Sequence, residues 1–242
     1  MPHEHSENVA RHFAGDWKAY DRQIRQVIPY YDQALTTMVD VIAASCPRPR
    51  LILDLGIGTG NLASLLLSAF PDARMVGVDI LQDFINQAGR RLGKYGDRTS
   101  LICADVAHFD FPSDYDVVVS SFMFHHLDNA LKRELFVRIH ETLSAGGCFV
   151  NLDFVHSGSG FYARKFDDLR IKAMQAQGVT DDRIATEYVE HRKLEIPVPL
   201  DRQLRWLEEA GFTDTECFLK YLNLAMFGGR KKGSGRQDGA PT

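Results

Sequence analysis

The chain has 242 residues, 45% of them hydrophobic, which is enough to bury the core of one catalytic-sized domain. Its formal net charge of -4 at pH 7 argues against a nucleic-acid-binding protein, because phosphate binding depends on clustered lysines and arginines. No apolar run reaches the roughly 20 residues that a membrane helix needs, and the polar start MPHEHSENVA lacks the order of a signal peptide, so we expect a cytoplasmic protein with no membrane partner.

Cysteines and histidines follow no pattern typical of a metal or disulfide site. The cysteines are widely spaced and never form a CxxC pair: Cys46, Cys103, Cys148 and Cys217. We therefore expect reduced thiols, with neither a zinc knuckle nor a disulfide framework. His125 and His126 are adjacent, but no third ligand stands at a recognisable spacing, so we predict no metal.

The first elements in chain order are helical. Trp17, Tyr20 and Ile24 recur at helical spacing, and we predict an N-terminal helical cap over residues 1–45. After the break CPRPR, the pattern changes to short apolar runs separated by helix-like segments. The runs are RLILDL, ARMVGVD, TSLICAD, YDVVVSS and GCFVNLDF, with helices expected over 61–70, 82–92 and 129–143. This alternation predicts a parallel sheet with helices on both faces.

The regular alternation stops after Phe154. Residues 155–199 predict two or three polar helices, which we interpret as a lid insertion above the carboxyl edge of the sheet. A helix, DRQLRWLEEAGF, then precedes two strand candidates, TDTECFLKY and LNLAMFGG, that are too close for a crossover helix and so predict an antiparallel last strand. The main domain is expected over 46–230, and the Gly-rich segment 231–242 is expected to be a disordered tail.

The stretch LDLGIGTG, from Leu53 to Gly60, predicts a ligand loop, because glycines directly after a buried strand let backbone approach a ligand closely. A P-loop would need Gly-Lys-Ser/Thr at its end, but Asn61 and Leu62 follow Gly60. The dinucleotide fingerprint G-x-G-x-x-G would need a third glycine at position 61, which is Asn61. Neither of these nucleotide loops fits.

The remaining pattern is D-x-G-x-G-x-G, formed by Asp54, Gly56, Gly58 and Gly60. Here the chain resembles the class I S-adenosylmethionine-dependent methyltransferases, from about Arg50 to the terminal strand pair. The resemblance implies a doubly wound, Rossmann-like α/β fold with a seven-stranded sheet, an antiparallel last strand, N-terminal helices and a helical lid insertion. It also implies that the loop packs against the amino-acid part of S-adenosylmethionine, with Asp54, Gly56 and Gly58 at the cofactor positions.

Further motifs match the family in the expected order. VGVDI places Asp79 and Ile80 after the second strand, where a carboxylate can accept hydrogen bonds from both ribose hydroxyls. ICADV places Asp105 and Val106 after the third strand, similar to the family's adenine contacts. An acidic residue at a strand end is also a common helix cap, so each motif alone has a structural interpretation. Five motifs in register make coincidence a poor explanation.

The segment SSFMFHHL follows the fourth strand and resembles the family's loop beneath the cofactor, with Ser120 and Ser121 at the strand end. The helical start, YDRQIRQVIPYYDQ, resembles a branch near the carboxy-S-adenosylmethionine synthases, in which an aromatic side chain closes over the cofactor. Tyr20 is the candidate here, and a helix-packing role for it is equally open. The glycine loop has the ordinary methyltransferase form, so we favour unmodified S-adenosylmethionine, although Arg192 lies where an arginine could bind an extra carboxylate.

Methyl transfer from a sulfonium mainly needs alignment and exclusion of water, because the cofactor carries its own leaving group. A hydroxyl or protonated amine acceptor also needs a base, and His125, His126 and Asp153 are the catalytic candidates. Adjacent residues point in different directions, so we expect one of the two histidines to face the pocket. The candidates for substrate contacts lie in the insertion, where they could instead be lid packing and a solvated face: Tyr162, Tyr188, His191 and Arg192.

We therefore expect a methyltransferase that acts on a small-molecule acceptor, for which a homodimer is one option. Within enzymes, the alternatives are a carboxy-S-adenosylmethionine synthase-like activity and a tRNA-modifying methyltransferase, the latter disfavoured by the acidic charge balance. A non-catalytic regulatory partner that binds the cofactor is an alternative of another class. An NAD-dependent oxidoreductase is opposed by Asn61, Asp105 and the closing strand pair.

Overall fold

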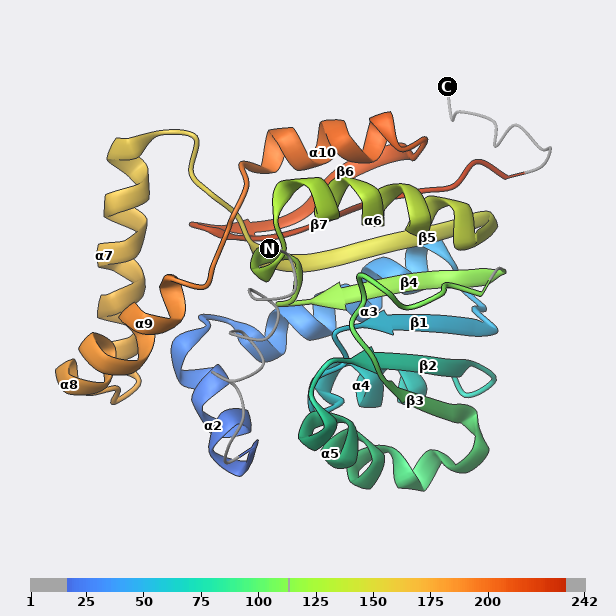
Figure 1. The fold of residues 1–242 in the computed structure, drawn as a ribbon, viewed down its shortest axis with the longest axis horizontal. Coiled ribbons are helices and arrows are strands. Elements are labelled where there is room, and N and C mark those ends of the chain that lie inside the picture. Colours follow the sequence, from blue (N-terminus) through green and yellow to red (C-terminus); the bar gives the residue numbers. More distant parts are fainter. Residues whose placement is uncertain (1–16, 113, 234–242) are drawn as a thin grey trace.

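A seven-stranded sheet forms the centre of the chain in a computed structural model that describes residues 17–112 and 114–233 (Figure 1). The strand order is β3-β2-β1-β4-β5-β7-β6. The strands are β1 (Leu51–Leu55), β2 (Arg74–Asp79), β3 (Thr99–Cys103), β4 (Tyr115–Ser121), β5 (Leu143–Phe154), β6 (Thr213–Tyr221) and β7 (Leu224–Arg230).

The direction of the strands places their ends for a ligand site. Strands β1 to β5 pair in parallel, whereas β7 is antiparallel to both β5 and β6. The first five strands therefore end at one common edge of the sheet, which lies to the left in Figure 1. The expected doubly wound sheet with an antiparallel last strand is confirmed. In such sheets, ligands bind outside the carboxyl ends of the strands.

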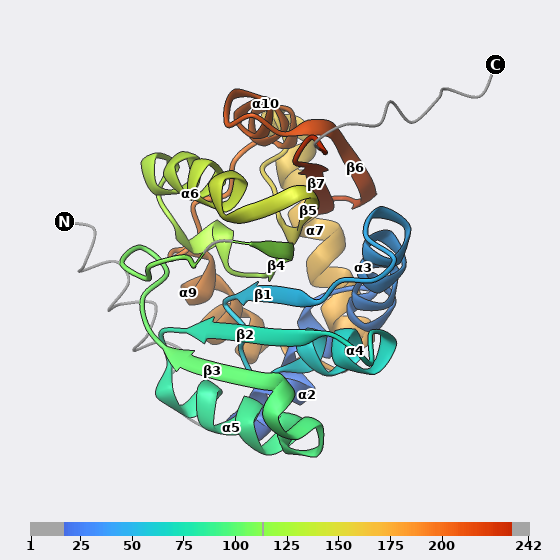
Figure 2. The same ribbon diagram turned by 90° about the vertical axis from the view of Figure 1, so that its right-hand side faces the viewer.

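Helices cover both faces of the sheet, so its central strands are buried on both sides and consist of nearly continuous apolar residues. On one face lie α3 (Tyr31–Ser45), α4 (Asn61–Ala69) and α5 (Gln82–Leu92), and on the other lie α6 (Asn129–Thr142) and α10 (Leu200–Glu209) (Figure 2). Ile42 and Leu66 belong to the hydrophobic core of the first face. Phe136 and Leu207 belong to that of the second.

The N-terminal segment divides into two parts with different roles. Helix α3 is part of the sheet packing, because Met38 and Ile42 are fully buried against it. Helix α2 (Trp17–Val27) instead lies at the carboxyl edge of the sheet (Figure 1). Residues 1–16 of the expected cap and residues 234–242 of the expected tail lie outside the described residues.

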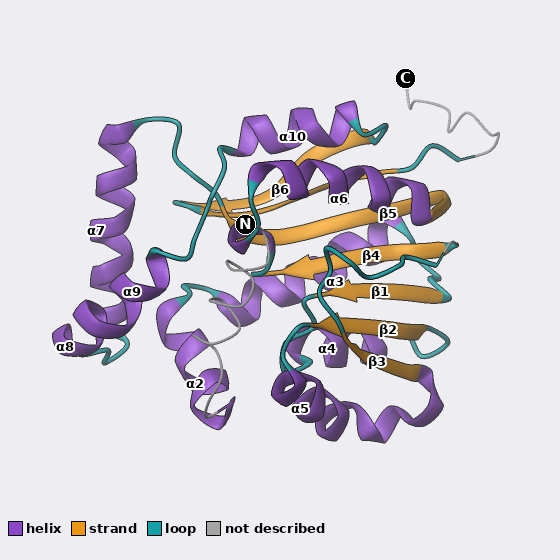
Figure 3. Cartoon of the chain, viewed as in Figure 1, coloured by secondary structure: helices purple, strands orange, loops and turns teal. Residues whose placement is uncertain are grey.

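The insertion after β5 is helical, as expected, and lies beyond the carboxyl edge of the sheet (Figure 3). It contains α7 (Gly160–Ala176), α8 (Asp181–Arg183), the π-helix η3 (Ile184–Tyr188) and α9 (Val189–Arg192). Met174, Val179, Ile184 and Tyr188 give the insertion a small core of its own. All four cysteines are free. Within the described residues, no helix combines the length and apolar content needed to cross a membrane.

Candidate active site

The glycine loop forms the floor of the site. After β1 the chain turns through Gly56, Gly58 and Gly60, which all have positive φ angles, of 74°, 56° and 82°. At Gly56 a Cβ atom would lie 2.7 Å from the Met123 side chain, so any other residue would clash as well as strain the backbone. The loop then leads into the N-terminus of α4. The tight turn expected from LDLGIGTG is present.

A pocket opens above this loop at the carboxyl edge of the sheet. Tyr20 and Ile24 of α2, the glycine loop, the start of α5 and the segment after β4 form its walls. A second pocket shares Gly56, Asp79, Ile80, Met123 and His126 with the first and extends to Asp105, Val106 and Leu127. Of the predicted site residues, the two pockets bring together Tyr20, Gly56, Gly58, Asp79, Ile80, Asp105, Val106, Ser121 and His126.

Asp79 stands where the two pockets meet. One of its carboxylate oxygens accepts a hydrogen bond from the Gly58 N–H at 2.8 Å, and the other accepts one from the Leu81 N–H at 2.9 Å. Burial raises the pKa of Asp79 to about 6, and backbone N–H donors oppose that rise. The carboxylate is therefore fixed against the glycine loop, with capacity left to accept further hydrogen bonds.

Asp105 and Val106 line the far end of the second pocket. The Asp105 carboxylate accepts a hydrogen bond from the Ala107 N–H at 2.9 Å, which closes a local turn after β3. Its other oxygen lies 3.8 Å from Nδ1 of His108. The side chain is about one-fifth exposed, so it borders both the pocket and solvent.

Two predicted cofactor residues do not line either pocket. Asp54 is 1% exposed, and neither of its carboxylate oxygens has a hydrogen-bond partner among the described residues. Burial and then the charge of Asp79 raise the pKa of Asp54 to about 8. The Ser120 hydroxyl donates to the Leu55 carbonyl at 2.8 Å instead of facing the pocket. Both side chains lie beneath the glycine loop, because they project from paired strands into the core rather than from the loop beyond them.

A polar network that the sequence did not reveal attaches α2 to the glycine loop. One oxygen of Asp21 accepts from the Thr59 hydroxyl at 2.6 Å and from the Asn61 amide at 3.0 Å. Its other oxygen pairs with Arg91 at 2.5 Å, and Arg91 also donates to the Thr59 carbonyl at 2.6 Å. The adjacent Tyr20 ring lies 4.9 Å from the Phe84 ring. The network thus fixes the helix that contributes Tyr20 to the pocket.

The segment after β4 contains another feature that was missed. Phe122 lines the pocket with a φ of 57°, a conformation that is costly for a residue with a bulky side chain. Its N–H donates to the Leu152 carbonyl at 2.9 Å, and its ring stacks on Tyr31. The surrounding contacts hold the strained turn that brings Phe122 and Met123 to the pocket.

His125 and His126 have separate environments, as expected for adjacent residues. His126 lines both pockets, and its Nδ1 lies 3.3 Å from the Leu194 carbonyl. His125 is 2% exposed, its Nδ1 is hydrogen-bonded to Asp153, and its backbone N–H donates to the other oxygen of Asp153 at 2.9 Å. Burial, and then the charges of Arg170, Lys132 and Arg192, hold the pKa of His125 well below its usual value. His125 is therefore a neutral imidazole held by a carboxylate.

The insertion brings a polar cluster against these histidines. The His191 ring lies 5.4 Å from that of His126, and His191 Nε2 lies 3.6 Å from Glu195. Arg192 pairs with Asp167 at 2.5 Å and with Glu195 at 3.2 Å. The Glu195 side chain is 2% exposed, and burial raises its pKa. Of the four insertion residues predicted to contact substrate, the structure places His191, Arg192 and Tyr188 in this buried region.

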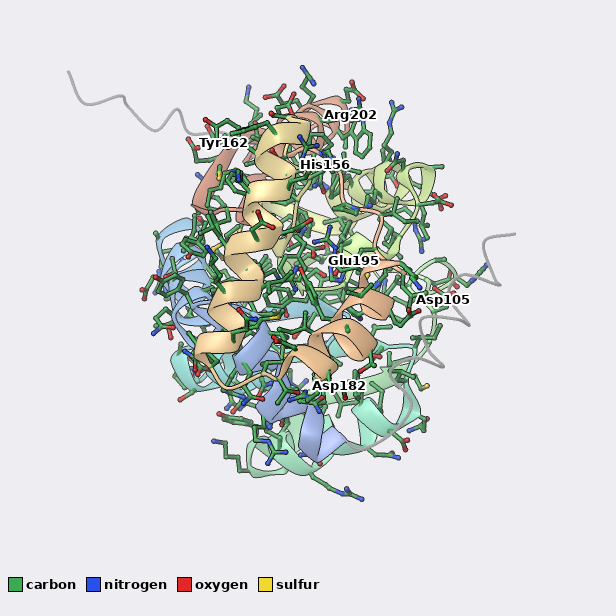
Figure 4. All side chains as sticks on the ribbon, turned by 90° about the vertical axis from the view of Figure 1, so that its left-hand side faces the viewer. Asp105, His156, Tyr162, Asp182, Glu195 and Arg202 are labelled. Carbon is green, nitrogen blue, oxygen red and sulfur yellow. The ribbon has the colours of Figure 1, made fainter. Side chains whose placement is uncertain are left out.

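The fourth, Tyr162, is elsewhere. It lies near the start of α7 and is 56% exposed, with its ring against Phe161 and Phe166. Figure 4 shows Tyr162 at one end of α7 and Glu195 well away from it, in the segment that follows α9. Tyr162 lines neither pocket, and the Phe166 ring beside it lies 5.4 Å from Lys220 Nζ of β6.

Comparisons with known proteins agree with this architecture. Residues 52–147 match the family model described as a methyltransferase domain. A carboxy-S-adenosyl-L-methionine synthase of Helicobacter hepaticus is 23% identical over 217 residues, covering 88% of this chain and 90% of that protein. An uncharacterized methyltransferase of Geobacillus thermodenitrificans is 28% identical over 183 residues, covering 72% of this chain and 80% of that protein.

Among solved structures, the 1,6-didemethyltoxoflavin-N1-methyltransferase of Burkholderia thailandensis superimposes with a TM-score of 0.67 at 16% identity. The match covers 96% of this chain and 91% of that one. Its fold is therefore shared across nearly the full length of both proteins. The glycine loop and the two acidic strand ends agree with these matches. Residues 52–147 thus form a methyltransferase domain, and the chain as a whole shares the fold of the methyltransferase it superimposes on.

Proposed function

We propose that the two pockets together bind S-adenosylmethionine and that the chain transfers its methyl group to a small polar acceptor held beneath the insertion. In this arrangement the adenine lies at Asp105 and Val106, and the ribose hydroxyls donate to Asp79. The methionine part follows the glycine loop, with Tyr20 above it. The division of these residues between the pockets supports the assignment, because Tyr20 and Gly58 line the first, Asp105 and Val106 line the second, and Asp79 lines both.

One observation carries the proposal: His126 lines both pockets and also borders the buried polar cluster of the insertion. The cofactor end and the insertion end of the site are thus joined by a single side chain. A methyl group leaving the cofactor has to meet an acceptor aligned with the breaking carbon–sulfur bond. The junction at His126 is where such an acceptor would lie.

The chemistry needs little beyond this alignment. The new bond from the acceptor to the methyl carbon forms as the carbon–sulfur bond breaks, and S-adenosylhomocysteine leaves with the electron pair. An acceptor hydroxyl or ammonium must also lose its proton, and the imidazoles at this end of the pocket are the groups suited to promote that loss. We propose His126 as the contact to the acceptor, with His125 and Asp153 behind it.

The polarity of the insertion supports a small polar acceptor. Arg170 is 2% exposed, its guanidinium lies over the Phe154 and Tyr188 rings, and the nearly buried Glu195 lies close by. Buried charges of both signs beside the cofactor pocket favour a compact molecule with polar groups over a polymer. The overall charge of -4 likewise gives no support for a tRNA substrate.

The similarity to carboxy-S-adenosyl-L-methionine synthases raises a second candidate, in which the cofactor carries an extra carboxylate. Arg192 is the arginine considered for that group. Its guanidinium already pairs with Asp167 and Glu195, and an added carboxylate would have to compete with both. We therefore favour unmodified S-adenosylmethionine.

Isothermal titration of the purified chain with S-adenosylmethionine, S-adenosylhomocysteine and NAD tests the proposal without knowledge of the acceptor. We expect the first two to bind at one site per chain and NAD to show no heat of binding. Tight binding of NAD without binding of the other two would contradict it. A screen of small hydroxyl, amine and thiol compounds for S-adenosylhomocysteine release then identifies the acceptor class.

A further inference from the structure

We propose that His125, His126 and His191 form a binding site for a zinc-class divalent cation at the junction of the cofactor pocket and the insertion. Each of the three residues offers a ligand nitrogen, and these nitrogens all lie within 4.8 Å of one another. Two come from the segment after β4 and the third from α9. The third ligand could not be recognised from spacing, because the fold brings it from a distant part of the chain.

The environment of His125 matches that of a metal-binding histidine. Such a ligand usually gives its second ring N–H to a carboxylate, which fixes the tautomer and orients the other nitrogen toward the metal. His125 Nδ1 bonds to Asp153 in this way. Its Nε2 is buried and has no hydrogen-bond partner among the described residues. A buried imidazole nitrogen without a partner carries an energetic cost that a coordinated cation would remove.

Backbone contacts hold the other side of the site. The Leu194 carbonyl lies 3.3 Å from His126 Nδ1. A backbone carbonyl in this position orients a metal-binding histidine as a carboxylate does. The Ile196 N–H donates to the His125 carbonyl at 2.6 Å, and Lys132 Nζ donates to the Ile196 carbonyl. The segment after α9 is thereby attached to the histidine pair.

His191 has to move only a short distance to complete the site. Nitrogens bound tetrahedrally to zinc at about 2.1 Å lie about 3.4 Å apart, so the present separations of up to 4.8 Å must shorten. The His191 side chain is about one-fifth exposed and stands in the last turn of α9, which leaves its ring room to rotate. Glu195 lies 3.6 Å from its Nε2, close enough to act as a carboxylate partner that orients the ring.

The charges around the cluster are mixed. Two carboxylates, Asp153 and Glu195, favour a cation. Lys132, Arg170 and Arg192 oppose it, and all three raise the energy of positive charge at His125. Arg192 is partly offset by Asp167 at 2.5 Å. A site with three imidazoles suits zinc and similar borderline ions, whereas magnesium and calcium prefer oxygen ligands.

The role of the cation in catalysis rests on the proposed function, but its binding does not. A zinc ion held by three protein ligands keeps a fourth position for water or substrate and lowers the pKa of a group bound there. At this junction, that group would be the acceptor's hydroxyl, amine or thiol. The cation would then promote proton loss that a histidine base would otherwise have to accomplish.

Metal binding by the untagged full chain, first stripped with a chelator, tests the inference. We expect equilibrium dialysis against zinc, read by elemental mass spectrometry, to give about one ion per chain, and Co2+ to give the intense visible bands of tetrahedral coordination. His191→Ala should weaken zinc binding by at least about 100-fold. The matched control is His156→Ala, since His156 is an exposed histidine outside the cluster. A His3→Gln/His5→Gln double variant, which removes the N-terminal histidines, should bind as the wild type does.

Absence of zinc binding by the folded wild-type chain would overturn the inference, as would undiminished binding by His191→Ala. His191 is the preferred position for substitution because it is less buried than His125, and circular dichroism checks that the variant folds. Titration of the same samples with S-adenosylhomocysteine separates the two proposals. Cofactor binding without zinc binding would rule out the metal site and leave the proposed function. Zinc binding without cofactor binding would rule out the proposed function and leave the metal site.

Discussion

His125 and Asp153 are joined twice, because one oxygen of the carboxylate bonds to the imidazole Nδ1 and the other accepts the His125 backbone N–H at 2.9 Å. The first residue follows β4 and the second lies in β5, so the pair connects neighbouring strands at their carboxyl ends. Both side chains are 2% exposed. This arrangement fixes the ring orientation and assigns the proton of the neutral imidazole to Nδ1.

Replacing this carboxylate should change the histidine tautomer. In Asp153→Asn the amide cannot reproduce both hydrogen bonds, so we expect the His125 proton to move to Nε2 in the metal-free protein. 15N NMR of labelled histidine measures this directly. The free energy of unfolding should fall by about 1–3 kcal/mol, since a buried acceptor is lost. An unchanged Nδ1-protonated spectrum would show that Asp153 does not set the tautomer.

Asp79→Ala should weaken S-adenosylmethionine binding by about 1–3 kcal/mol through the loss of acceptors for the ribose hydroxyls. Isothermal titration measures the change. Asp97→Ala is the control, because Asp97 is an exposed acid paired only loosely with Arg74, at 3.4 Å. Equal affinities for the Asp79 variant and the wild type would remove Asp79 from the cofactor site.

The buried Asp54 predicts how stability depends on pH. Its pKa of about 8 in the folded protein exceeds the ordinary value of 3.8. The folded state therefore keeps a proton that the unfolded state loses, and stability falls by about 1.4 kcal/mol for each pH unit between the two values. Asp54→Asn should lessen this fall in the cofactor-free protein and raise the melting temperature at pH 8. Denaturant unfolding at several pH values measures it, and parallel curves for the two proteins would contradict the account.

Asp21→Ala should loosen α2 from the glycine loop, because it removes the partner of Thr59, Asn61 and Arg91. The cofactor would then have to order the helix as it binds, and we expect its affinity to fall by about 5- to 30-fold. Hydrogen exchange of residues 17–27 should become faster. Asp201→Ala is the control, since Asp201 forms an exposed pair with Arg205 within α10, away from α2. Equal exchange in both variants would exclude the fastening role of Asp21.

The cofactor side of the site could be predicted because it depends on local signals. A parallel strand places whatever follows it at the common edge, so Asp79, Asp105 and the glycines could be located from the strands alone. Asp54 and Ser120 line neither pocket. Each stands within its strand, where the direction of the side chain depends on pleat and packing.

The acceptor side depends on contacts between distant segments. The ion pair between Asp21 and Arg91 and the ring contact between His191 and His126 form only because α2 and the insertion fold over the sheet edge. The hydrophobic periodicity of the sequence does not predict contacts between such distant segments. Tyr162 stands in the same segment, but it is 56% exposed and lines neither pocket. The rotation of α7 is set by its packing against α2 and β5, which the sequence pattern of a polar helix does not specify.

Native mass spectrometry of the purified chain, before and after addition of S-adenosylmethionine, tests the central claim most directly. We predict a one-to-one complex with the mass of S-adenosylmethionine or S-adenosylhomocysteine, and its loss in Asp79→Ala. A bound species heavier than S-adenosylmethionine by a carboxylate would move the assignment to the carboxylated cofactor. Failure to bind any of the three by a folded chain would contradict the account.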